Sequence, residues 1–384
     1  MGGHAAGEVA SSVAVREVRR VIAENRDIVE RYSNEETPAG RQEVLRLIES
    51  SIEQACARIF HIAQENPDKR GMGTTLSMML VAGRRGFIGH VGDSRVYLTR
   101  SNQVHQLTED HSLINELIKR GRLKPEDAHK APYKNAVTRA VGVHADVQVD
   151  TLDFEVGDGD HFLLCSDGLT NHLRDDREIV EVMGKTSFLS QPEHFINLAN
   201  ERGGKDNITT LVVQVATPKS AGDTQIKVQA LRQMPLFQHL SYVELTEVLN
   251  VSELKLYEPG DLVFGEGSPG DSFFVVIEGR VGIRKGEVEL ARLGPGGHFG
   301  EMAIMDKGPR SATVMALMPS RLIRVGRKPL FRLMRKDKEI AVKLLWCFVQ
   351  VLNQRLRMTN ADLQQARTEQ LELEELLGLE EITE

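Results

Sequence analysis

Glycine recurs at short intervals between residues 260 and 300, and this spacing constrains the fold more than any other feature of the sequence. Short apolar segments separate the glycines. Glycine readily adopts the positive φ that tight turns need, and short apolar segments between turns are typical of β-strands. The pattern predicts a small all-β roll or jelly roll. The glycines are Gly260, Gly265, Gly267, Gly270, Gly279, Gly282, Gly286, Gly294, Gly296, Gly297 and Gly300.

The chain from about Lys328 onward has the apolar spacing of a helix. A seven-residue repeat can be written from Leu345, and most of its two inner positions are apolar. Such a repeat favours a coiled coil and therefore predicts a parallel homodimer through this helix. The alternative is a single helix packed on its own domain, with an acidic end that frays from Gly378. The two sets of inner positions are Leu345, Leu352, Thr359, Ala366 and Leu373, and Val349, Leu356, Leu363, Gln370 and Leu377.

Residues 1 to about 216 mix helical and strand-like patterns. Val13–Asn25 and Val44–Asn66 carry apolar residues at helical spacing. Strand-like runs follow, and their order predicts an α+β fold, a sandwich of two sheets between helices, rather than alternating β-α units. The runs are Thr74–Val81, Gly86–Val91, Val96–Thr99, Val147–Phe154, His161–Cys165 and Ile208–Val215.

A polar segment, Ala216–Asp223, separates this half of the chain from the glycine-rich half. It contains Pro218 and Gly222, which interrupt regular structure, and it is therefore the best linker candidate. The segment after it, Pro235–Leu254, is predicted to be helical.

Charge and cysteine content exclude several classes of protein. The net charge is −7, and the last 24 residues hold eight acidic residues and one basic residue, so the chain lacks the basic footprint of a nucleic-acid binder. Cys56, Cys165 and Cys347 lie far apart without metal-ligand spacing, which fits a reducing compartment. No apolar run reaches the ~18–20 residues of a membrane span, and no signal-peptide pattern is present. We therefore expect a cytoplasmic protein that binds neither nucleic acid nor membranes.

The segment from Phe299 to Ala312 has the chemistry of a cyclic-nucleotide receptor. Such a ligand offers a singly charged phosphate diester and a ribose 2′-hydroxyl. Arg310 can make a two-pronged contact with the phosphate, and Glu301 can accept a hydrogen bond from the hydroxyl. Gly300 lets the backbone come close, and Met302–Met305 could form a helical turn whose N–H groups face the phosphate.

These residues resemble the phosphate-binding cassette of cyclic-nucleotide-binding domains. The resemblance covers Phe299–Ala303 and Arg310–Val314, and Gly270–Gly279 is similar to the strand–turn signature of the same family. It implies that cyclic AMP or cyclic GMP acts as a regulatory ligand. The implied nucleotide-binding residues are Gly300, Glu301, Met302, Ala303, Arg310, Ser311 and Ala312.

Three aspartates in the N-terminal half lie next to predicted strands. Asp93 and Asp167 follow strands, and Asp206 precedes one. Carboxylates that converge in this way bind hard divalent cations such as Mg²⁺ or Mn²⁺. A pair of such ions can activate a water molecule and clamp a phosphate ester. Each aspartate alone is more often a turn residue, but their shared order and spacing make coincidence a poor explanation.

The segments that carry these aspartates resemble the metal-dependent serine/threonine phosphatases of the protein phosphatase 2C family. The resemblance implies phosphoserine and phosphothreonine proteins as substrates and two or three Mg²⁺ or Mn²⁺ ions. It makes Asp167 and Asp206 ligands of the catalytic metal pair and Asp93 a ligand of the third site of bacterial members, with Asn207 bracing Asp206. The matching segments are Gly71–Thr75, Gly92–Arg95, Leu107–Ser112, Thr138–Gly142, Leu164–Thr170 and Gly203–Thr209.

Two histidines near these segments have weaker functional interpretations. His4 could act as a general acid, although a histidine in a glycine turn is more often structural. His111 is predicted to be a capping and loop residue. A Ser–His–Asp triad at Asp110–Ser112 is excluded because adjacent residues cannot all face one substrate.

The sequence departs from the phosphatase pattern at its start. The family motif reads Asp-Gly-Met-Gly-Gly-His, whereas this chain begins Met1-Gly2-Gly3-His4. The resemblance therefore places the bridging aspartate, and a glycine whose carbonyl binds metal, before Met1. We expect Met1 to be an internal methionine of a longer, active protein; the alternative is a truncated, inactive phosphatase. Without the bridging carboxylate, the two-metal site and nearly all catalysis should be lost.

The sequence thus predicts four parts and one main function. The parts are a phosphatase-like domain without its first strands (1–216), a linker (217–230), a mainly-β cyclic-nucleotide-binding domain (231–357) and an acidic helical tail (358–384). The expected function is that of a metal-dependent phosphatase regulated by a cyclic nucleotide. The alternative is a non-catalytic nucleotide sensor or docking protein with a degenerate phosphatase domain.

Overall fold

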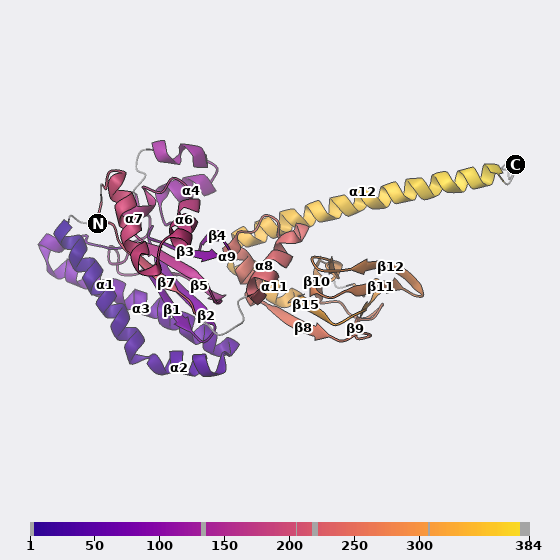
Figure 1. Ribbon diagram of the computed structural model, residues 1–384, viewed down its shortest axis with the longest axis horizontal. Helices are drawn as coiled ribbons and strands as arrows, with labels where there is room; N and C mark the ends of the chain where they lie inside the picture. The colour runs from indigo at the N-terminus through magenta and orange to yellow at the C-terminus, as the bar shows by residue number, and fades with distance from the viewer. Residues whose placement is uncertain (1–3, 132–135, 205, 217–221, 306–307, 377–384) are drawn as a thin grey trace. The chain divides into compact units, whose positions relative to one another are not determined.

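The computed structural model describes residues 4–131, 136–204, 206–216, 222–305 and 308–376 of the 384-residue chain. The side chains of His4, Ala303 and some residues of the last helix also lie outside the described part. The chain divides into two compact units, Met1–Thr224 and Gln225–Glu384, and each is described by itself (Figure 1).

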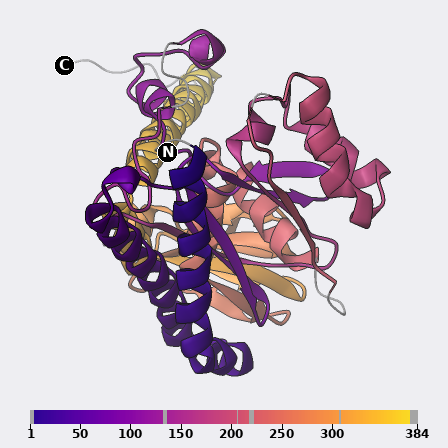
Figure 2. The same ribbon diagram turned by 90° about the vertical axis from the view of Figure 1, so that its left-hand side faces the viewer.

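Three helices open the first unit: α1 (His4–Glu24), α2 (Arg26–Glu35) and α3 (Pro38–Glu65). The predicted helices Val13–Asn25 and Val44–Asn66 correspond to α1 and α3, but both predictions begin too late. The hydroxyl of Thr37 accepts a hydrogen bond from the Gly40 N–H, and this cap begins α3 ahead of its apolar stripe. Helix α2 was not predicted. Figure 2 shows α1 and α3 side by side.

Two antiparallel sheets follow these helices. The strand order is β1-β2-β5 in the first sheet and β4-β3-β6-β7 in the second. The predicted strands are confirmed to within a few residues at their ends, but β4 was not predicted because it is short and mostly polar. The strands are β1 (Leu76–Ala82), β2 (Arg85–Val91), β3 (Arg95–Arg100), β4 (Gln103–Gln106), β5 (Asp150–Glu155), β6 (His161–Cys165) and β7 (Thr210–Gln214).

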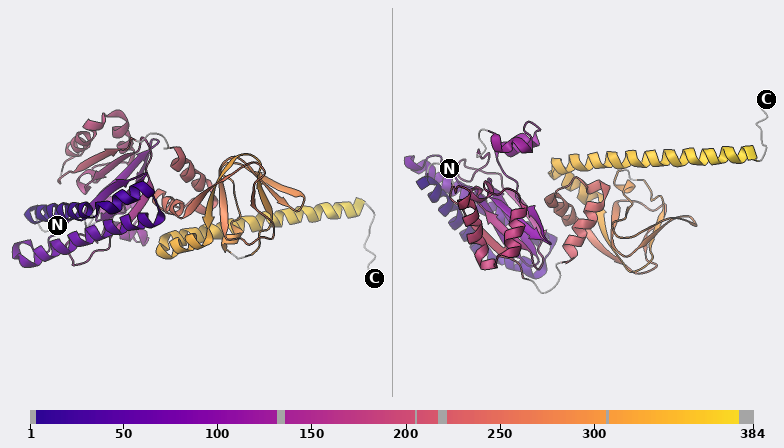
Figure 3. Two further views of the ribbon diagram at one scale, coloured as in Figure 1. Left: turned by 90° about the horizontal axis from the view of Figure 1, so that it is seen from below. Right: turned by 45° about the horizontal axis from the view of Figure 1, so that its top comes forward.

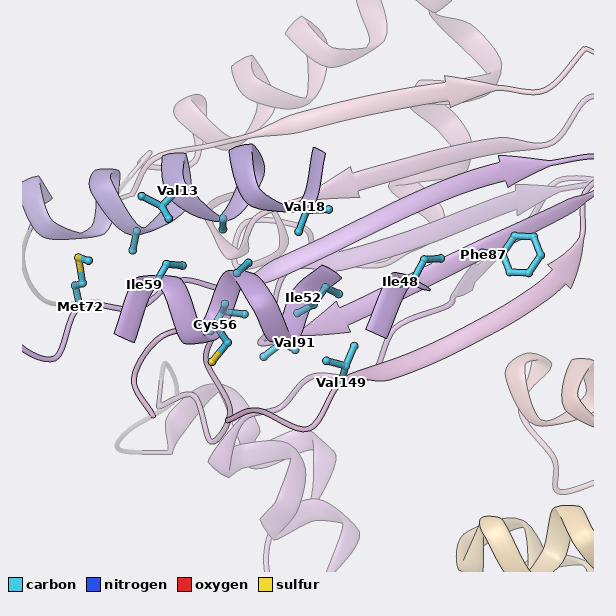
Figure 4. Close-up of a cluster of buried hydrophobic side chains, with 14 of the residues drawn as sticks. Val13, Val18, Ile48, Ile52, Cys56, Ile59, Met72, Phe87, Val91 and Val149 are labelled. Atoms are coloured by element: carbon cyan, nitrogen blue, oxygen red, sulfur yellow. The ribbon is translucent and has the colours of Figure 1, made fainter. Parts of the chain in front are cut away.

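The two sheets pack face to face between two layers of helices. The rings of Phe154 on the first sheet and Phe162 on the second lie 5.6 Å apart between centroids. Ile48 and Ile52 of α3 pack against the first sheet near Phe87 (Figure 4). Helices α6 (Arg177–Lys185) and α7 (Gln191–Glu201) bury their apolar faces with residues of the second sheet. The predicted α+β sandwich, with layers in the order helix, sheet, sheet, helix, is confirmed.

A buried ion pair links β3 to the loop that leads into β6. The side chains of Arg100 and Asp160 are 6% and 2% exposed, and the Arg100 Nε donates to the Asp160 Oδ1 at 2.7 Å. Arg100 also donates to the Glu155 carbonyl, and the Gly157 N–H donates to Asp160. Such additional hydrogen bonds are what make a buried pair tolerable. The pair fixes the start of β6, the strand that ends beside Asp167.

The second unit is a roll of two four-stranded antiparallel sheets, which confirms the mainly-β prediction (Figure 3). The strand order is β13-β10-β15-β8 in one sheet and β12-β11-β14-β9 in the other. The strands are β8 (Ser252–Tyr257), β9 (Leu262–Phe264), β10 (Ser272–Glu278), β11 (Val281–Lys285), β12 (Val288–Leu293), β13 (His298–Phe299), β14 (Thr313–Ala316) and β15 (Ser320–Gly326).

Helices precede and follow the roll in the sequence. Helix α8 (Gly222–Gln233) contains residues 222–230 of the predicted linker. The predicted helix Pro235–Leu254 is wrong at both ends: Pro235–Phe237 is a 3-10 turn, and α9 covers only Tyr242–Asn250. A capping box between Ser241 and Glu244 begins α9. The residues after α9 alternate polar and apolar side chains and form β8, which pairs with β15.

The roll is followed by α11 (Arg327–Lys336) and by α12 (Lys338–Leu376), which is one continuous helix. Ile340, Leu344 and Phe348 of α12 are buried, whereas another row of large apolar residues along it is exposed. Residues from Leu377 on lie outside the described part, so the predicted fraying at Gly378 is not tested. None of the described helices is long and apolar enough to cross a membrane.

Candidate functional site

A cavity of about 340 Å³ lies in the roll where the predicted cassette meets β9, β11 and β14. Its wall includes Gly300, Glu301, Met302, Arg310, Ser311 and Ala312. These are six of the seven predicted nucleotide-binding residues, and the side chain of the seventh, Ala303, lies outside the described part. Phe264, Ile283 and Val314 give the cavity an apolar side. Its volume is in the range of small-molecule sites.

Gly300 lies at the tight turn between β13 and α10 (Met302–Met305), where only a residue without a side chain fits. Its φ is +79°, and a Cβ at this position would lie 2.7 Å from an Nη of Arg310. Any larger residue would strain the backbone and displace the guanidinium. The predicted helical turn at Met302–Met305 is confirmed as α10.

Arg310 lies against the wall of the cavity and is 7% exposed. Its Nη1 donates to the Ser272 carbonyl at 2.7 Å and to the Gly300 carbonyl at 3.3 Å. Its guanidinium carbon lies 4.0 Å from the centre of the Phe264 ring. Burial lowers the pKa of Arg310, and nearby acidic groups oppose that effect. Among the described residues, its hydrogen-bond partners are two carbonyl oxygens and the Ser272 hydroxyl, and its Nε has no partner, so the guanidinium is available to an anionic ligand.

The other cassette residues differ in exposure. Glu301 is 9% exposed and Ala312 is 8% exposed, whereas Met302 is 54% exposed. Ser311 is exposed at the edge of the cavity. A ligand in the cavity would therefore meet Glu301 and Arg310 deep in the roll and Ser311 near solvent.

The three predicted metal ligands of the first unit lie at strand ends. Asp93 follows β2, Asp167 is the first residue of α5 (Asp167–Thr170) directly after β6, and Asp206 precedes β7. Because β6 and β7 are antiparallel neighbours, the end of β6 and the start of β7 lie at one edge of the second sheet. Asp167 and Asp206 are therefore brought to the same edge.

Ser166 and Gly168 hold the loops that carry Asp167 and Asp206. The Ser166 Oγ accepts from the Thr209 N–H at 3.0 Å and donates to the Asn207 carbonyl at 3.2 Å. A Cβ on Gly168 would lie 2.4 Å from that carbonyl oxygen. The two loops can approach this closely only because residue 168 is glycine.

The electrostatics of the three aspartates fit a cation. Burial, with the charge of Asp167 adding to the effect, raises the pKa of Asp93 to about 6. Burial also raises the pKa of Asp167, and Asp206 adds to that effect. Each carboxylate thus opposes ionisation of its neighbour, which a bound divalent ion would relieve. Within the described residues, however, no three carboxylate, imidazole or thiolate groups are close enough together to form a metal site.

The remaining predicted residues are placed as follows. The Asn207 backbone N–H donates to the Asp206 Oδ1 at 2.7 Å, and no contact tests the bracing role predicted for its side chain. His4 is the first residue of α1, and its side chain lies outside the described part. All three cysteines are buried free thiols.

The prediction for His111 is right that it lies in a loop but wrong that it is a cap. Ser112, not His111, caps α4 (Leu113–Lys119), by accepting from the Asn115 N–H. His111 is 5% exposed, and its ring contacts Gly92 and Asp150. The sequence did not reveal what the His111 ring contacts, because Gly92 and Asp150 are distant from it in the chain.

A partly buried ion pair, between Arg95 and Asp110, was also not predicted. Arg95 donates two hydrogen bonds to Asp110, at 2.8 and 2.7 Å, and one to the Tyr97 hydroxyl at 2.9 Å. Burial opposes the charge of Arg95, but the Asp110 hydrogen bonds raise its pKa. Both residues belong to segments that the sequence singled out, yet only their pairing shows that they support the Asp93 turn.

Comparison with family models identifies both units. The protein phosphatase 2C model matches residues 1–212, and the cyclic nucleotide-binding domain model matches residues 254–337. The phosphatase match covers more than half of the chain. The nucleotide-binding match contains the cassette and all eight strands of the roll except the first two residues of β8.

Curated relatives agree with the phosphatase match. The serine/threonine phosphatase stp of Listeria welshimeri is 39% identical over 214 residues, which is 56% of this chain and 81% of the relative. Protein phosphatase PhpP of Streptococcus pneumoniae is 35% identical over 216 residues, with 56% of this chain and 82% of the relative covered.

Solved structures are also similar in sequence. The Mycobacterium tuberculosis phosphatase PstP/Ppp is 34% identical, with a TM-score of 0.48 and coverage of 56% of this chain and 86% of that chain. A structure of the PstP catalytic domain contains two manganese ions; it is 33% identical, with a TM-score of 0.48 and coverage of 56% and 85%. The family model and the curated relatives carry the assignment: this chain belongs to the protein phosphatase 2C family of serine/threonine phosphatases, with a cyclic nucleotide-binding domain after the phosphatase domain.

Proposed function

We propose that this protein is a cytoplasmic, metal-dependent phosphatase for phosphoserine and phosphothreonine proteins, whose rate changes when cyclic AMP or cyclic GMP binds. The observation that carries this proposal is the cavity around Gly300, Glu301 and Arg310 on the same chain as the phosphatase domain. A ligand that binds one conformation of the second unit more tightly than another shifts the population toward that conformation.

In the phosphatase unit, Asp167 and Asp206 would hold the catalytic metal pair and Asp93 a third ion, with Mg²⁺ or Mn²⁺ as the cation. When bound, such ions supply an activated water and stabilise charge on the phosphoryl oxygens. The chain keeps Asp167 and Asp206 at one edge through Ser166 and Gly168. In this proposal, Asn207 supports Asp206, and His4 acts as the general acid.

In the nucleotide-binding unit, Arg310 would turn from the Ser272 and Gly300 carbonyls to the cyclic phosphate. Glu301, at the buried end of the cavity, would accept from the ribose 2′-hydroxyl. The Ser311 hydroxyl could bind either the phosphate or guanine, so both cyclic nucleotides remain ligands in the proposal. Met302, Ala303 and Ala312 would complete the wall.

Regulation is tested by the rate of phosphopeptide hydrolysis in the full-length gene product with Mn²⁺ present. We expect saturating cyclic AMP or cyclic GMP to change the rate by about 5-fold or more, the lower range of allosteric coupling. The non-cyclic nucleotide 5′-AMP, which lacks the diester, is the control and should have no effect. Absence of hydrolysis would contradict the catalytic proposal, and hydrolysis that ignores both cyclic nucleotides would contradict only the regulatory one.

A non-catalytic nucleotide sensor is the second candidate. It is favoured by the absence, among the described side chains, of a group of three ligands placed to hold a metal. The sensor should bind a cyclic nucleotide while Mn²⁺ neither binds nor produces hydrolysis. Isothermal titration with Mn²⁺ and with each nucleotide therefore separates the two candidates.

We also propose that α12 forms a parallel homodimer with a second copy of the chain. A row of exposed apolar side chains follows the helix at the spacing of the predicted seven-residue repeat. Isolated exposed apolar residues are ordinary, but a continuous stripe on one helix is typical of a coiled-coil seam. The row is Val342, Leu345, Val349, Leu352, Leu356 and Leu363, and Trp346 is exposed beside it.

Light scattering should give about twice the chain mass of 42.8 kDa for the unmodified protein. Replacing both Leu352 and Leu356 with glutamate should shift the protein to monomer, because two charges would face each other across the seam. The control replaces Asn353 and Asn360 with glutamate; both are exposed on the same helix but outside the inner positions. A monomeric mass for the unmodified protein would contradict the dimer.

A further inference from the structure

The turn that presents Asp93 depends on the position of the Gly92 backbone. Gly92 has a φ of +116°, and a Cβ there would lie 2.4 Å from the Thr75 side chain. No substituted residue fits this position without displacement of Thr75. The direction of the next side chain, Asp93, is therefore set by whatever holds the Gly92 amide and carbonyl in place.

His111 holds both of these groups. The Gly92 N–H donates to the His111 Nδ1 at 3.1 Å, and the His111 backbone N–H donates to the Gly92 carbonyl at 2.7 Å. Because Nδ1 accepts a hydrogen bond, the ring proton of the neutral imidazole must be on Nε2. His111 is 5% exposed, so water does not readily replace it as the acceptor.

Asp150 fixes the other side of the same ring. The His111 Nε2 lies 3.0 Å from the Asp150 Oδ2, and the Arg139 Nη1 donates to the Asp150 Oδ1 at 2.6 Å. The Thr138 N–H donates to the His111 carbonyl at 2.7 Å, which anchors its backbone as well. In metal sites, a carboxylate commonly fixes the tautomer and the orientation of an imidazole in this way.

The geometry points to His111, oriented by Asp150, as the positioning residue for Asp93: its Nδ1 accepts the Gly92 N–H and so aims the Asp93 carboxylate at a divalent cation. This inference rests on the proposed function, in which Asp93 is a metal ligand. It gives the histidine a role that does not require contact with substrate or metal. It also explains why a polar ring is buried next to His90, whose centroid lies 4.9 Å away, where an apolar side chain could have packed.

Two substitutions separate the two hydrogen bonds of the ring. His111→Asn keeps an acceptor at the place of Nδ1 and loses the link to Asp150. His111→Gln keeps a donor toward Asp150 and loses the acceptor for Gly92. The probe is Mn²⁺ alone, titrated by calorimetry into the full-length gene product, and thermal unfolding is measured for each variant. Asp93→Asn is the reference for loss of the metal ligand itself.

The binding event of interest is the one that Asp93→Asn removes. We expect His111→Gln to weaken Mn²⁺ affinity in this event by about 10-fold or more, the range found for groups that orient metal ligands. His111→Asn should retain most of that binding. Equal metal affinity in the two His111 variants, with only a shared loss of thermal stability, would overturn the positioning role. If Asp93→Asn itself leaves Mn²⁺ binding unchanged, the metal assignment of Asp93 fails, and this inference fails with it.

Discussion

Replacing Arg310 with alanine is expected to weaken cyclic nucleotide binding by at least about 30-fold, because loss of one partner of a buried charged contact costs about 2–5 kcal/mol. The reason is the position of the guanidinium: it is 7% exposed at the wall of the cavity and stacks on Phe264 at 4.0 Å. Isothermal titration with cyclic AMP and with cyclic GMP measures the loss.

The matched control for this substitution is Arg292→Ala. Arg292 carries the same charge in the same unit, but it is exposed and pairs with Glu289. The control should bind each nucleotide as the unmodified protein does. An Arg310→Ala variant whose affinity stays within about 3-fold of the unmodified protein, a difference of less than 1 kcal/mol, would show that the ligand phosphate lies elsewhere.

Replacing Asp167 with asparagine is expected to lower kcat/KM for a phosphothreonine peptide by at least about 1000-fold, which corresponds to about 4 kcal/mol of transition-state stabilisation. The substitution removes a carboxylate from the proposed metal pair and leaves the shape of the side chain nearly unchanged. Hydrolysis by the full-length gene product with Mn²⁺ provides the measurement.

The Asp167→Asn variant should also differ from the unmodified protein in thermal stability when no metal is present. Burial, with Asp206 adding to the effect, raises the pKa of Asp167, so the folded state favours its neutral form. Stability therefore falls as the pH rises from the ordinary aspartate pKa to this raised pKa, and it stays lower at higher pH. Asparagine imitates the neutral form. The metal-free variant should therefore unfold at a higher temperature than the unmodified protein at pH 7, and added Mn²⁺ should stabilise it less.

Asp175→Asn is the control for both signatures, because Asp175 is an exposed carboxylate in the same part of the chain. It should change neither the rate nor the response to Mn²⁺. If Asp167→Asn retains the full rate, the assignment of Asp167 to the metal pair is wrong, whatever its effect on stability.

Local sequence signals were sufficient for much of the fold. The strands of the first unit were predicted because alternation of apolar residues and flanking turns are local properties. The roll was predicted from its glycines for the same reason. Helix α2 and strand β4 were not predicted, since neither carries a clear periodic stripe. The end of the predicted helix Pro235–Leu254 was wrong because pairing with β15 decides the conformation of β8.

The candidate sites were also predictable only where the signal is local in the sequence. Short motifs singled out Glu301 and Arg310, which line one cavity, and Asp167, whose role as a metal ligand stays a prediction. The support behind the site was not predictable. The Arg95–Asp110 pair and the His111 ring depend on contacts between residues far apart in the chain. Such contacts follow from the packing of β2, β3 and β5, which a local pattern does not contain.

The hydrogen bonds of Arg310 at the wall of the cavity have a consequence for signalling. Its Nη1 is already bound to the Ser272 and Gly300 carbonyls, so a phosphate that binds this nitrogen would exchange for these oxygens, whereas the buried Nε has no hydrogen-bond partner among the described residues. Exchange of one set of hydrogen bonds for another gains less free energy than formation of new ones. Release of a bound cyclic nucleotide would be correspondingly easy, because the guanidinium can return to these carbonyls. Such a cavity is suited to following changes in nucleotide concentration rather than to retaining the ligand once it has bound.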